Sequence, residues 1–376
     1  MLIGPTAHLQ RCSSASLPVG LLGMLALVAV VEASVAGHRA DLAPPWAEDW
    51  RFSTSAAERK AAGSEVLCFG DSLVKYGVLP RVIEAKTGWK SFNLATSGGT
   101  MPSAYFLLKR AFDAGAKPKA VVVDFDALML EDAEPVSLRN YPELATMADC
   151  VDLAWSEGDT RFMGALVLAK LVPSYRWRFE VRALVRAAIE GRDGSRRQTN
   201  ATFRLTWETH GGAQPMPPGR VRHPSEDYLI DGVSPASWSI GSKDEAYLDR
   251  FVALAESRGV AVYWLIPPLC PEAHARRQVQ GADEAYGRLA RSKLSRFANL
   301  TILDARSSRY DDSVHVDHIH LDRVGATALS GDLAAILANR FAEKAPSRWV
   351  ALPNYSGRPA TTNQSEVANR EGTTVR

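Results

Sequence analysis

One serine and one histidine, far apart in the chain, stand beside residues that would make them chemically useful. Ser72 follows Gly70 and Asp71 at the end of an apolar run, and His320 lies three residues after Asp317. A serine hydroxyl is a weak nucleophile near neutral pH and needs a base to take its proton. A carboxylate beside a histidine holds the imidazole in one tautomer and stabilises its protonated form. These residue types predict acyl chemistry in which Ser72 attacks, His320 is the base and Asp317 orients His320.

Short apolar segments that alternate with amphipathic segments must position these residues. Such alternation is typical of a parallel sheet covered by helices on both faces. The expected fold is α/β, with three layers (α/β/α) and a five-stranded parallel sheet. Strands are expected at residues 65–69, 90–95, 120–125, 260–266 and 300–303, and helices at 72–86, 102–114, 244–258, 283–296 and 321–342.

Three groups of chemical interest follow strands of this sheet: Ser72, Gly98 and Asp126. In a doubly wound sheet, ligands bind at the carboxyl ends of the strands. A serine there begins a helix whose first N–H groups are available to an oxyanion. A glycine after the next strand lets a second backbone N–H approach the same point. The alternative is that Gly70 to Ser72 only caps a helix, because Asp and Ser are both favoured at that position.

A metal site formed by His315, His318 and His320 is a second alternative. No further cluster of ligands accompanies these histidines, and Asp317 has a role without a metal. The chain contains no Walker A loop, no Gly-x-Gly-x-x-Gly and no His-Glu-x-x-His. We therefore expect neither a metal nor a cofactor.

Three sequence blocks resemble those of the SGNH/GDSL hydrolase superfamily, and they occur in the order found there. The matching residues are 69–73 (Phe-Gly-Asp-Ser-Leu), 93–98 (Asn-Leu-Ala-Thr-Ser-Gly) and, in the last block, Asp317, His320, Leu321 and Gly325. The resemblance covers about 65–126 and 260–342. It implies the flavodoxin-like fold of that superfamily, Ser72, His320 and Asp317 as catalytic residues, Gly98 as an oxyanion donor, and an ester-linked acyl group as substrate.

The third block of the superfamily is not matched. Members have Gly-x-Asn-Asp after the third strand, and the asparagine amide donates to the oxyanion, whereas this chain has Asp126 at the asparagine position. An ionised carboxylate there would repel the oxyanion. Three explanations stay open: Asp126 is protonated, or it is turned away, or the oxyanion hole has only the N–H groups of Ser72 and Gly98.

The N-terminus is almost entirely apolar from Leu17 to Val31 and ends in small residues around Ala36. Two interpretations compete for residues 1–36: an uncleaved membrane anchor, or a signal peptide cleaved near Ala36. A buried core helix is a weaker third. We favour the anchor slightly, and either of the first two places the rest of the chain outside the cytoplasm.

The remaining chain divides by composition. We expect a linker at 37–63, the SGNH hydrolase-like domain at 64–343 with a largely helical insertion at about 132–243, and a disordered tail at 344–376.

A basic run at 176–197 is interpreted as the solvated face of a helix. Cys150 and Cys270 are candidates for a disulfide in an oxidising compartment. The aromatic residues of the insertion either stack on sugar rings or close its core; they are Trp155, Tyr175, Trp177, Trp207, Tyr228 and Trp238.

The expected function is that of a serine esterase acting on an acyl ester or an acylated carbohydrate. The superfamily resemblance adds a second candidate, an O-acyltransferase that modifies a surface polysaccharide, because some membrane-tethered members resemble O-acetyltransferases of such polysaccharides. A catalytically weak binding or assembly protein that keeps the fold is a third. The net charge of +2 over 376 residues argues against nucleic acid as the main partner.

Overall fold

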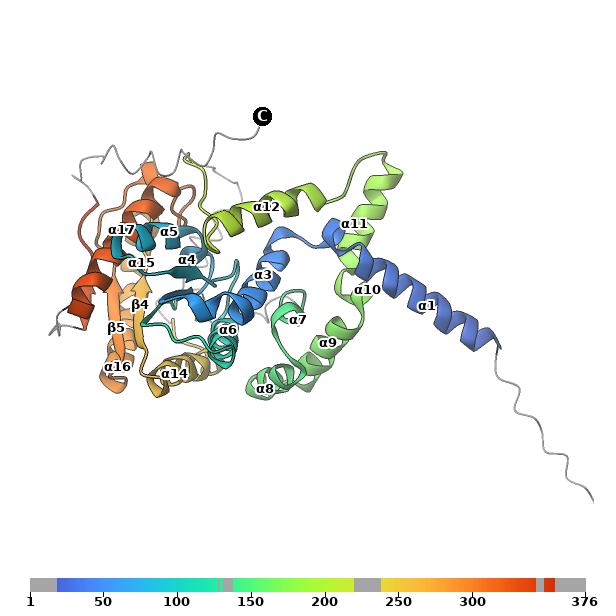
Figure 1. Ribbon diagram of the computed structural model, residues 1–376, viewed down its shortest axis with the longest axis horizontal. Helices are drawn as coiled ribbons and strands as arrows, with labels where there is room; N and C mark the ends of the chain where they lie inside the picture. The colour runs from blue at the N-terminus through green and yellow to red at the C-terminus, as the bar shows by residue number, and fades with distance from the viewer. Residues whose placement is uncertain (1–18, 128, 131–137, 220–237, 343–347, 356–376) are drawn as a thin grey trace, which may run out of the picture.

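A computed structural model describes residues 19–127, 129–130, 138–219, 238–342 and 348–355. One parallel sheet lies in this part, on the side away from α1 (Figure 1). The sheet has six strands in the order β2-β1-β3-β4-β5-β6. Every neighbouring pair is parallel. The strands are β1 (Val66–Phe69), β2 (Ser91–Asn93), β3 (Ala120–Asp124), β4 (Ala261–Ile266), β5 (Leu300–Asp304) and β6 (Trp349–Ala351).

The expected number of five strands is wrong, because β6 extends the sheet beyond β5. This strand lies in the segment 344–376, for which composition predicts disorder. The N–H of Leu352, just after β6, donates to the carbonyl of Asp304 at 2.8 Å, and the Leu352 side chain is buried. A short apolar segment inside a polar tail is hard to recognise from sequence, and pairing with the open edge of β5 is what makes it a strand.

Apolar side chains of the sheet alternate between two separate clusters, as the two-residue period of a strand requires. Leu67 and Phe69 of β1 belong to one cluster, and Val66 and Cys68 belong to the other. The first cluster includes residues of α3 (Pro45–Arg59), α6 (Met101–Asp113), α14 (Ser242–Ser257) and α16 (Ala282–Arg296). The second includes residues of α4 (Ser72–Gly77), α5 (Pro80–Thr87) and α17 (Arg323–Ala342). Helices therefore cover both faces of the sheet.

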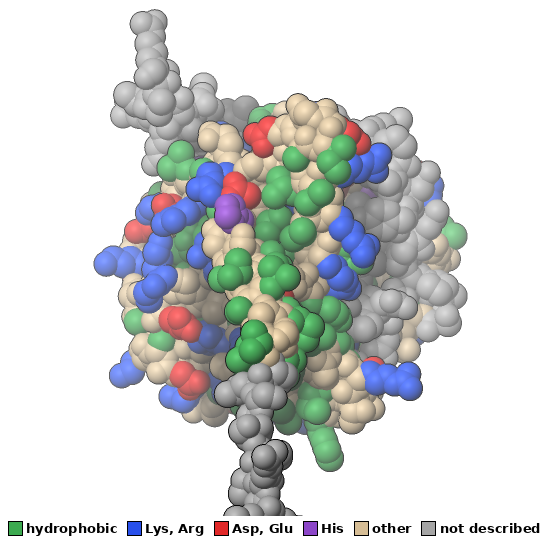
Figure 2. Space-filling view, turned by 90° about the vertical axis from the view of Figure 1, so that its right-hand side faces the viewer, with side chains coloured by type: hydrophobic (Ala, Val, Ile, Leu, Met, Phe, Trp, Pro, Cys, Tyr) green, Lys and Arg blue, Asp and Glu red, His purple; other side chains and the backbone are tan. Residues whose placement is uncertain are grey.

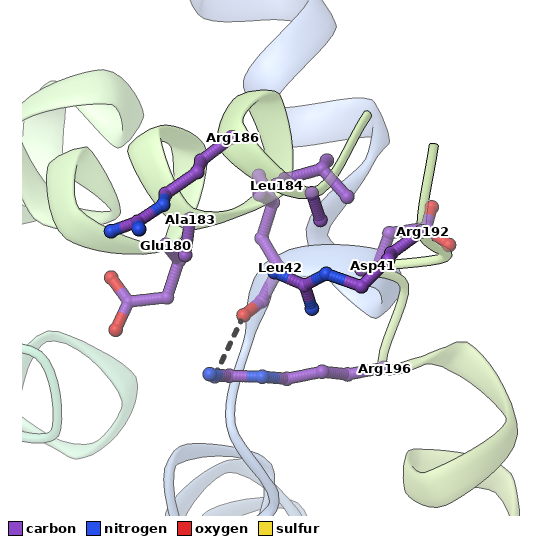
Figure 3. Close-up of a pocket in the computed structure, with 10 residues that line it drawn as sticks. Asp41, Leu42, Glu180, Ala183, Leu184, Arg186, Arg192 and Arg196 are labelled. Carbon is purple, nitrogen blue, oxygen red and sulfur yellow. Dashed lines mark hydrogen bonds between the residues drawn. The ribbon is translucent and has the colours of Figure 1, made fainter. Parts of the chain in front are cut away.

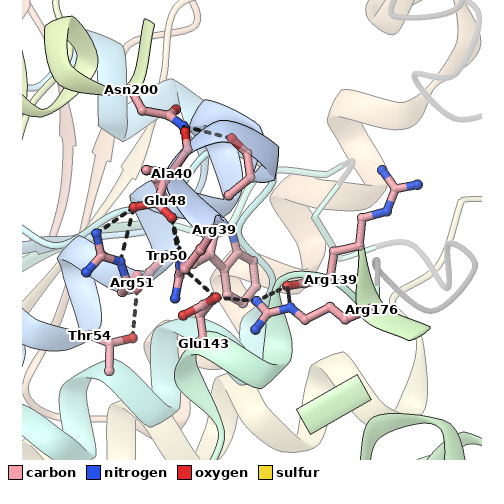
Figure 4. A network of polar contacts seen from close by, with 11 residues as sticks. Arg39, Ala40, Glu48, Trp50, Arg51, Thr54, Arg139, Glu143, Arg176 and Asn200 are labelled. Atoms are coloured by element: carbon pink, nitrogen blue, oxygen red, sulfur yellow. Dashed lines mark hydrogen bonds and ion pairs between the residues drawn. The ribbon is translucent and has the colours of Figure 1, made fainter. Parts of the chain in front are cut away.

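The segment 37–63 forms α2 (Arg39–Leu42), α3 and a 3₁₀ turn (Ala61–Gly63), and not the expected linker. Proline at the first position of α3 favours a helix start, and Trp50 of α3 is fully buried in the core. Figure 4 shows how the segment joins the insertion: Glu48 pairs with Arg39 and Arg51, and Arg39 also pairs with Glu143. The many small residues of α3 make its buried face weakly apolar, which is why the sequence resembles a linker.

The insertion is helical, as predicted, in the part that the structure describes. Its helices are α7 (Tyr141–Leu144), α8 (Met147–Glu157), α9 (Thr160–Leu171), α10 (Pro173–Arg176), α11 (Arg178–Ile189) and α12 (Arg197–Thr209). Figure 1 shows α9, α10 and α11 on the side of the molecule from which α1 extends, while α12 runs back toward the sheet. Residues 220–237 of the insertion lie outside the described residues.

The N-terminal helix α1 (Val19–Gly37) is, within the described ranges, the one helix long and apolar enough to cross a membrane. A signal sequence near the N-terminus has the same properties, so length and composition alone fit both. The end of α1 contacts the rest of the protein. The N–H of Ser174 in α10 donates to Glu32 at 2.8 Å, and Val35 packs against a cluster that includes Leu42 and Trp177.

Candidate active site

Ser72 is far in sequence from Asp317 and His320, and the fold brings the three side chains together. Ser72 is the first residue of α4, directly after β1, and its Oγ is 2.8 Å from His320 Nε2. His320 Nδ1 lies 2.6 Å from Asp317 Oδ2. The other oxygen of Asp317 accepts the backbone N–H groups of Ile319 and His320, at 2.9 and 2.7 Å. These contacts fix the carboxylate, which in turn fixes the imidazole.

The electrostatics of Asp317 agree with this geometry. Burial raises the pKa of Asp317, but its hydrogen bond to His320 and the charge of that residue outweigh burial and hold the pKa below its ordinary value. Asp317 is therefore an anion at neutral pH. An anion at this distance favours a proton on Nδ1 and leaves Nε2 as the acceptor that faces Ser72.

The turn that carries Ser72 is built around Gly70. Gly70 has a φ of 129°, and a Cβ placed there would lie 1.5 Å from Asp124 Oδ1, so no other residue fits. That same oxygen accepts the N–H of Asp71 at 3.1 Å. Asp71 in turn caps α4, because its Oδ1 accepts the Leu73 N–H at 2.7 Å. The predicted helix cap is thus present together with the serine–histidine contact.

Asp71, which is half-buried, and the fully buried Asp124 form an acidic pair next to Ser72. Burial, and then the charge of Asp126, raise the pKa of Asp71 to about 6, although hydrogen bonds from Asp124 and Leu73 oppose the shift. Burial and the charge of Asp71 raise the pKa of Asp124 well above its ordinary value. At neutral pH the pair therefore keeps a proton, which limits the negative charge that faces the site.

Asp126, at the position where the superfamily has asparagine, is paired with a cation. Its Oδ2 lies 3.3 Å from Arg277 Nη1 in α15 (Pro271–Gln280), and both side chains are almost fully buried. Arg277 also contacts Asp283 at 3.1 Å. The structure therefore directs one carboxylate oxygen of Asp126 to Arg277, and this ion pair offsets part of a charge that still raises the pKa of Asp71.

Side chains of α3 hold the loop that carries Gly98 through hydrogen bonds to Ser97. Asp49 Oδ2 accepts the N–H of Ser97 at 2.8 Å, and its other oxygen lies 2.6 Å from the Nζ of Lys75, both side chains being fully buried. Trp50 Nε1 donates to the carbonyl of Ser97 at 3.0 Å. Gly98 itself is exposed and has a φ of 63°. Its left-handed conformation turns the backbone at the position where the sequence predicts an oxyanion donor.

Tyr76 connects this loop to the triad. Its hydroxyl is 2.8 Å from Ser97 Oγ, and its ring packs edge-on against His320 with 5.2 Å between ring centroids. Sequence reasoning missed Tyr76, and it also missed Asp49, Lys75 and Arg277. A lysine inside the apolar run Leu73 to Val78 is a weak signal of a buried charge, but nothing in the sequence identifies its partner.

The three candidate metal-binding histidines have different partners. His315 Nδ1 contacts the carbonyl of Asp311 at 2.9 Å, and His318 Nδ1 lies 3.5 Å from Cys270 Sγ. No group of three metal ligands occurs among the residues that the structure describes. Neither Cys270 nor Cys150 is in a disulfide, and the two lie in separate clusters, so the disulfide that the sequence left open is not formed.

Three of the six aromatic residues singled out in the insertion are buried in apolar clusters, two of them in the main core of the domain. Trp177, Trp207 and Trp238 are buried, whereas Trp155 is 87% exposed. Tyr175 is half-buried under the guanidinium of Arg178. The sixth, Tyr228, lies outside the described residues. The three buried residues are therefore not accessible for stacking on sugar rings.

Two cavities show where a ligand has room. The one in Figure 3 measures about 290 Å³ and lies between α2, α11 and the segment before α12, with Asp41, Glu180 and Arg196 in its wall. The helices and the segment around this cavity do not carry Ser72, Asp317 or His320. The second measures about 530 Å³, and one of its walls is Leu269, which packs with Leu73 and Ile319 beside Ser72 and His320. The second cavity is therefore the nearer to the triad.

Position in the sheet also favours a site here. The strand order reverses between β1 and β3, and Ser72 follows β1 while Asp126 follows β3. In open parallel sheets, ligands bind beyond the carboxyl ends of the strands at such a switch point. No protein-family model matches the chain, and no curated protein matches it.

Proposed function

We propose that this protein is a serine-nucleophile esterase of the SGNH/GDSL type, acting on an ester-linked acyl group. The observation that carries the proposal is the continuous contact from Ser72 Oγ through His320 to Asp317, with distances of 2.8 and 2.6 Å. A serine–histidine–carboxylate arrangement is recognised by this geometry and not by sequence position. With helices on both faces of the sheet, we also infer the three-layer, flavodoxin-like arrangement of that superfamily.

The proposed reaction begins when His320 Nε2 takes the hydroxyl proton of Ser72. Ser72 Oγ bonds to the acyl carbon, and the carbonyl oxygen becomes an oxyanion. The N–H groups of Ser72 and Gly98 are the proposed donors to that oxyanion. His320 then gives its proton to the leaving alcohol, which leaves an acyl group on Ser72. Water, activated by His320, attacks the acyl carbon and regenerates the serine.

Transfer of the acyl group to a sugar hydroxyl is the second candidate, because the same acyl group on Ser72 serves both reactions. The observation that favours it is the ion pair of Asp126 with Arg277. With Asp126 paired to Arg277, the oxyanion would be bound by backbone N–H groups alone, without the asparagine amide that the superfamily uses. Such an oxyanion hole is weaker, which fits slow hydrolysis.

The test of the esterase proposal is reaction with a serine-directed fluorophosphonate, followed by mass spectrometry of the peptide that contains Ser72. We expect one added phosphonyl group on Ser72. His320→Ala should react far more slowly, because the base is lost. Ser307→Ala, at an exposed serine that lines the second cavity, is the matched control and should react normally. An unmodified Ser72 in folded protein would instead favour the catalytically weak binding or assembly protein.

We propose further that α1 is an uncleaved anchor and that the domain lies outside the cytoplasm. Cleavage near Ala36 would remove both the Glu32 contact with α10 and the packing of Val35. The purified protein should therefore retain residues 19–36 by mass spectrometry. Protease added to intact cells should digest the domain; protection until lysis would reverse the proposed topology.

A further inference from the structure

The exposed side of α11 combines large apolar side chains with arginines. Phe179, Val185 and Ile189 are 48, 53 and 82% exposed, and Arg182 and Arg186 are exposed beside them. At 3.6 residues per turn, these five positions fall on one side of the helix. Within an ordinary solvated helix, apolar residues of this size face the core. The sequence-based interpretation of 176–197 as a solvated face therefore does not explain this side.

The opposite side of α11 is already occupied. Val181 and Leu184 pack against the cluster that contains Trp177, and Val35 at the end of α1 packs against the same cluster. The two helices are thus joined through one apolar cluster. Figure 1 shows that α11 lies at the end of the molecule from which α1 extends. The exposed side of α11 is therefore close to the place where α1 leaves the domain.

The chemistry of this end of the molecule fits a lipid surface. Figure 2 looks at this end and shows a band of hydrophobic side chains with Lys and Arg side chains on both sides of it. Residues 176–197 hold seven arginines against three acidic residues, an excess of four positive charges. Helices that lie in the headgroup region of a bilayer combine apolar residues with Lys or Arg in this way. Basic residues next to an anchor are attracted to anionic lipids.

We infer that the exposed side of α11 lies on the surface of the bilayer that α1 enters. Phe179, Val185 and Ile189 contact the boundary of the acyl chains, and Arg182 and Arg186 face the phosphates of anionic lipids. The inference rests on the proposed anchoring through α1. Because α11 and the end of α1 pack against the same apolar cluster, the two membrane contacts together hold the domain in one orientation on the membrane.

Environment-sensitive fluorophores at three positions test this inference in the full-length chain. Single cysteines are placed at Leu25 in α1, Ile189 in α11 and Val279 in α15, in a Cys12→Ser background, where the remaining cysteines are buried. Val279 is 89% exposed and belongs to the other end of the molecule (Figure 1), so it is the matched control. All three side chains are exposed, so the substitutions preserve the fold. The labelled proteins are reconstituted in phosphatidylglycerol-containing vesicles.

We expect blue-shifted emission, and quenching by lipid-attached nitroxides, for Leu25→Cys and Ile189→Cys but not for Val279→Cys. Adding Arg182→Glu should reduce the shift at Ile189, whereas Arg288→Glu on α16 should not. If the label at Ile189 is in water while that at Leu25 is in lipid, the inference is overturned and the anchoring stands. If Ile189 is shielded only when membrane proteins are added, the face binds protein and the inference is overturned. If the label at Leu25 is in water, both the anchoring through α1 and the surface contact of α11 are overturned.

Discussion

In the proposed mechanism, His320 serves Ser72 as a base only in the tautomer that Asp317 favours, so the three side chains would act as one unit. We expect Ser72→Ala and His320→Ala each to lower kcat on a small aryl ester by at least about a thousandfold. The double variant should be no worse than either single variant, since each removes the same step. Asp317→Asn should cost less than either. Initial rates with purified folded variants measure this; turnover that survives in Ser72→Ala excludes Ser72 as the nucleophile.

The acidic pair beside Ser72 makes stability depend on pH. Because burial raises the pKa of Asp71 to about 6, the folded protein keeps a proton that the unfolded chain releases near pH 4. The free energy of unfolding should therefore fall as pH rises from about 4 to about 6. Asp71→Asn still accepts the Leu73 N–H but carries no titrating group. We expect it to match the wild type near pH 4 and to exceed it at pH 7 by up to about 2 kcal/mol, allowing for partial solvent screening.

Urea unfolding at a series of pH values measures this difference. Asp159→Asn is the control, because Asp159 also caps a helix, α9, with its Oδ1 2.8 Å from the Arg161 N–H, but is exposed and far in sequence from the site. Its difference from the wild type should not change with pH. A pH-independent difference for Asp71→Asn as well would show that the pKa of Asp71 is not raised in the folded protein.

At the scale of elements, α3 determines the position of the Gly98 loop through Asp49. Asp49→Asn leaves the buried Lys75 without its anion and weakens the hold on the Ser97 N–H. We expect the free energy of unfolding to fall by about 3 kcal/mol. We also expect kcat to fall by up to about a hundredfold with little change in KM, because a displaced Gly98 N–H affects the oxyanion more than substrate binding.

Two further variants separate positioning from stability. Asp249→Asn disturbs another pair with a buried lysine, Lys293 at 2.7 Å, on α14 and α16. It should lower stability without lowering kcat in the folded protein. Asp49→Asn combined with Lys75→Met removes the buried charge and should recover stability but not kcat. A double variant with the wild-type kcat would show that Asp49 does not position the loop.

Features that depend on local sequence patterns could be predicted, whereas features that depend on contacts between distant residues could not. Strands β1 to β5 follow from apolar runs, and the meeting of Ser72 with His320 follows from their places after a strand and before the last helix. Asp49 is different, because its function exists only through contacts with Lys75 and Ser97 that the sequence does not relate. The same holds for Asp126, whose partner Arg277 lies in a helix, α15, that the pattern does not reveal.

At the scale of the whole molecule, the segment 348–355, which contains β6, contacts the chain just before the loop that carries Asp317 and His320. Beyond β6, the Tyr355 ring stacks on Tyr310 at 4.8 Å, and its N–H donates to the carbonyl of Ser308 at 2.6 Å. Tyr310 is buried in the same cluster as Val314 and Leu352. Removing this segment would therefore uncover the edge of β5 and loosen the chain just before Asp317 and His320.

Two truncations test this role with a matched control. A chain that ends at residue 355 keeps β6 and Tyr355, whereas a chain that ends at residue 346 loses both. We expect the shorter chain to lose at least about 2 kcal/mol of unfolding free energy, since burial of one leucine contributes about that much. It should also associate through the uncovered edge of β5, and its kcat on an aryl ester should fall because Tyr310 no longer supports the loop. The longer chain should equal the full-length protein in urea unfolding, light scattering and turnover. Equal stability and equal turnover of both truncations would mean that β5 is the true edge of the sheet. Equal stability with reduced turnover in the shorter chain would confine the role of β6 to the loop.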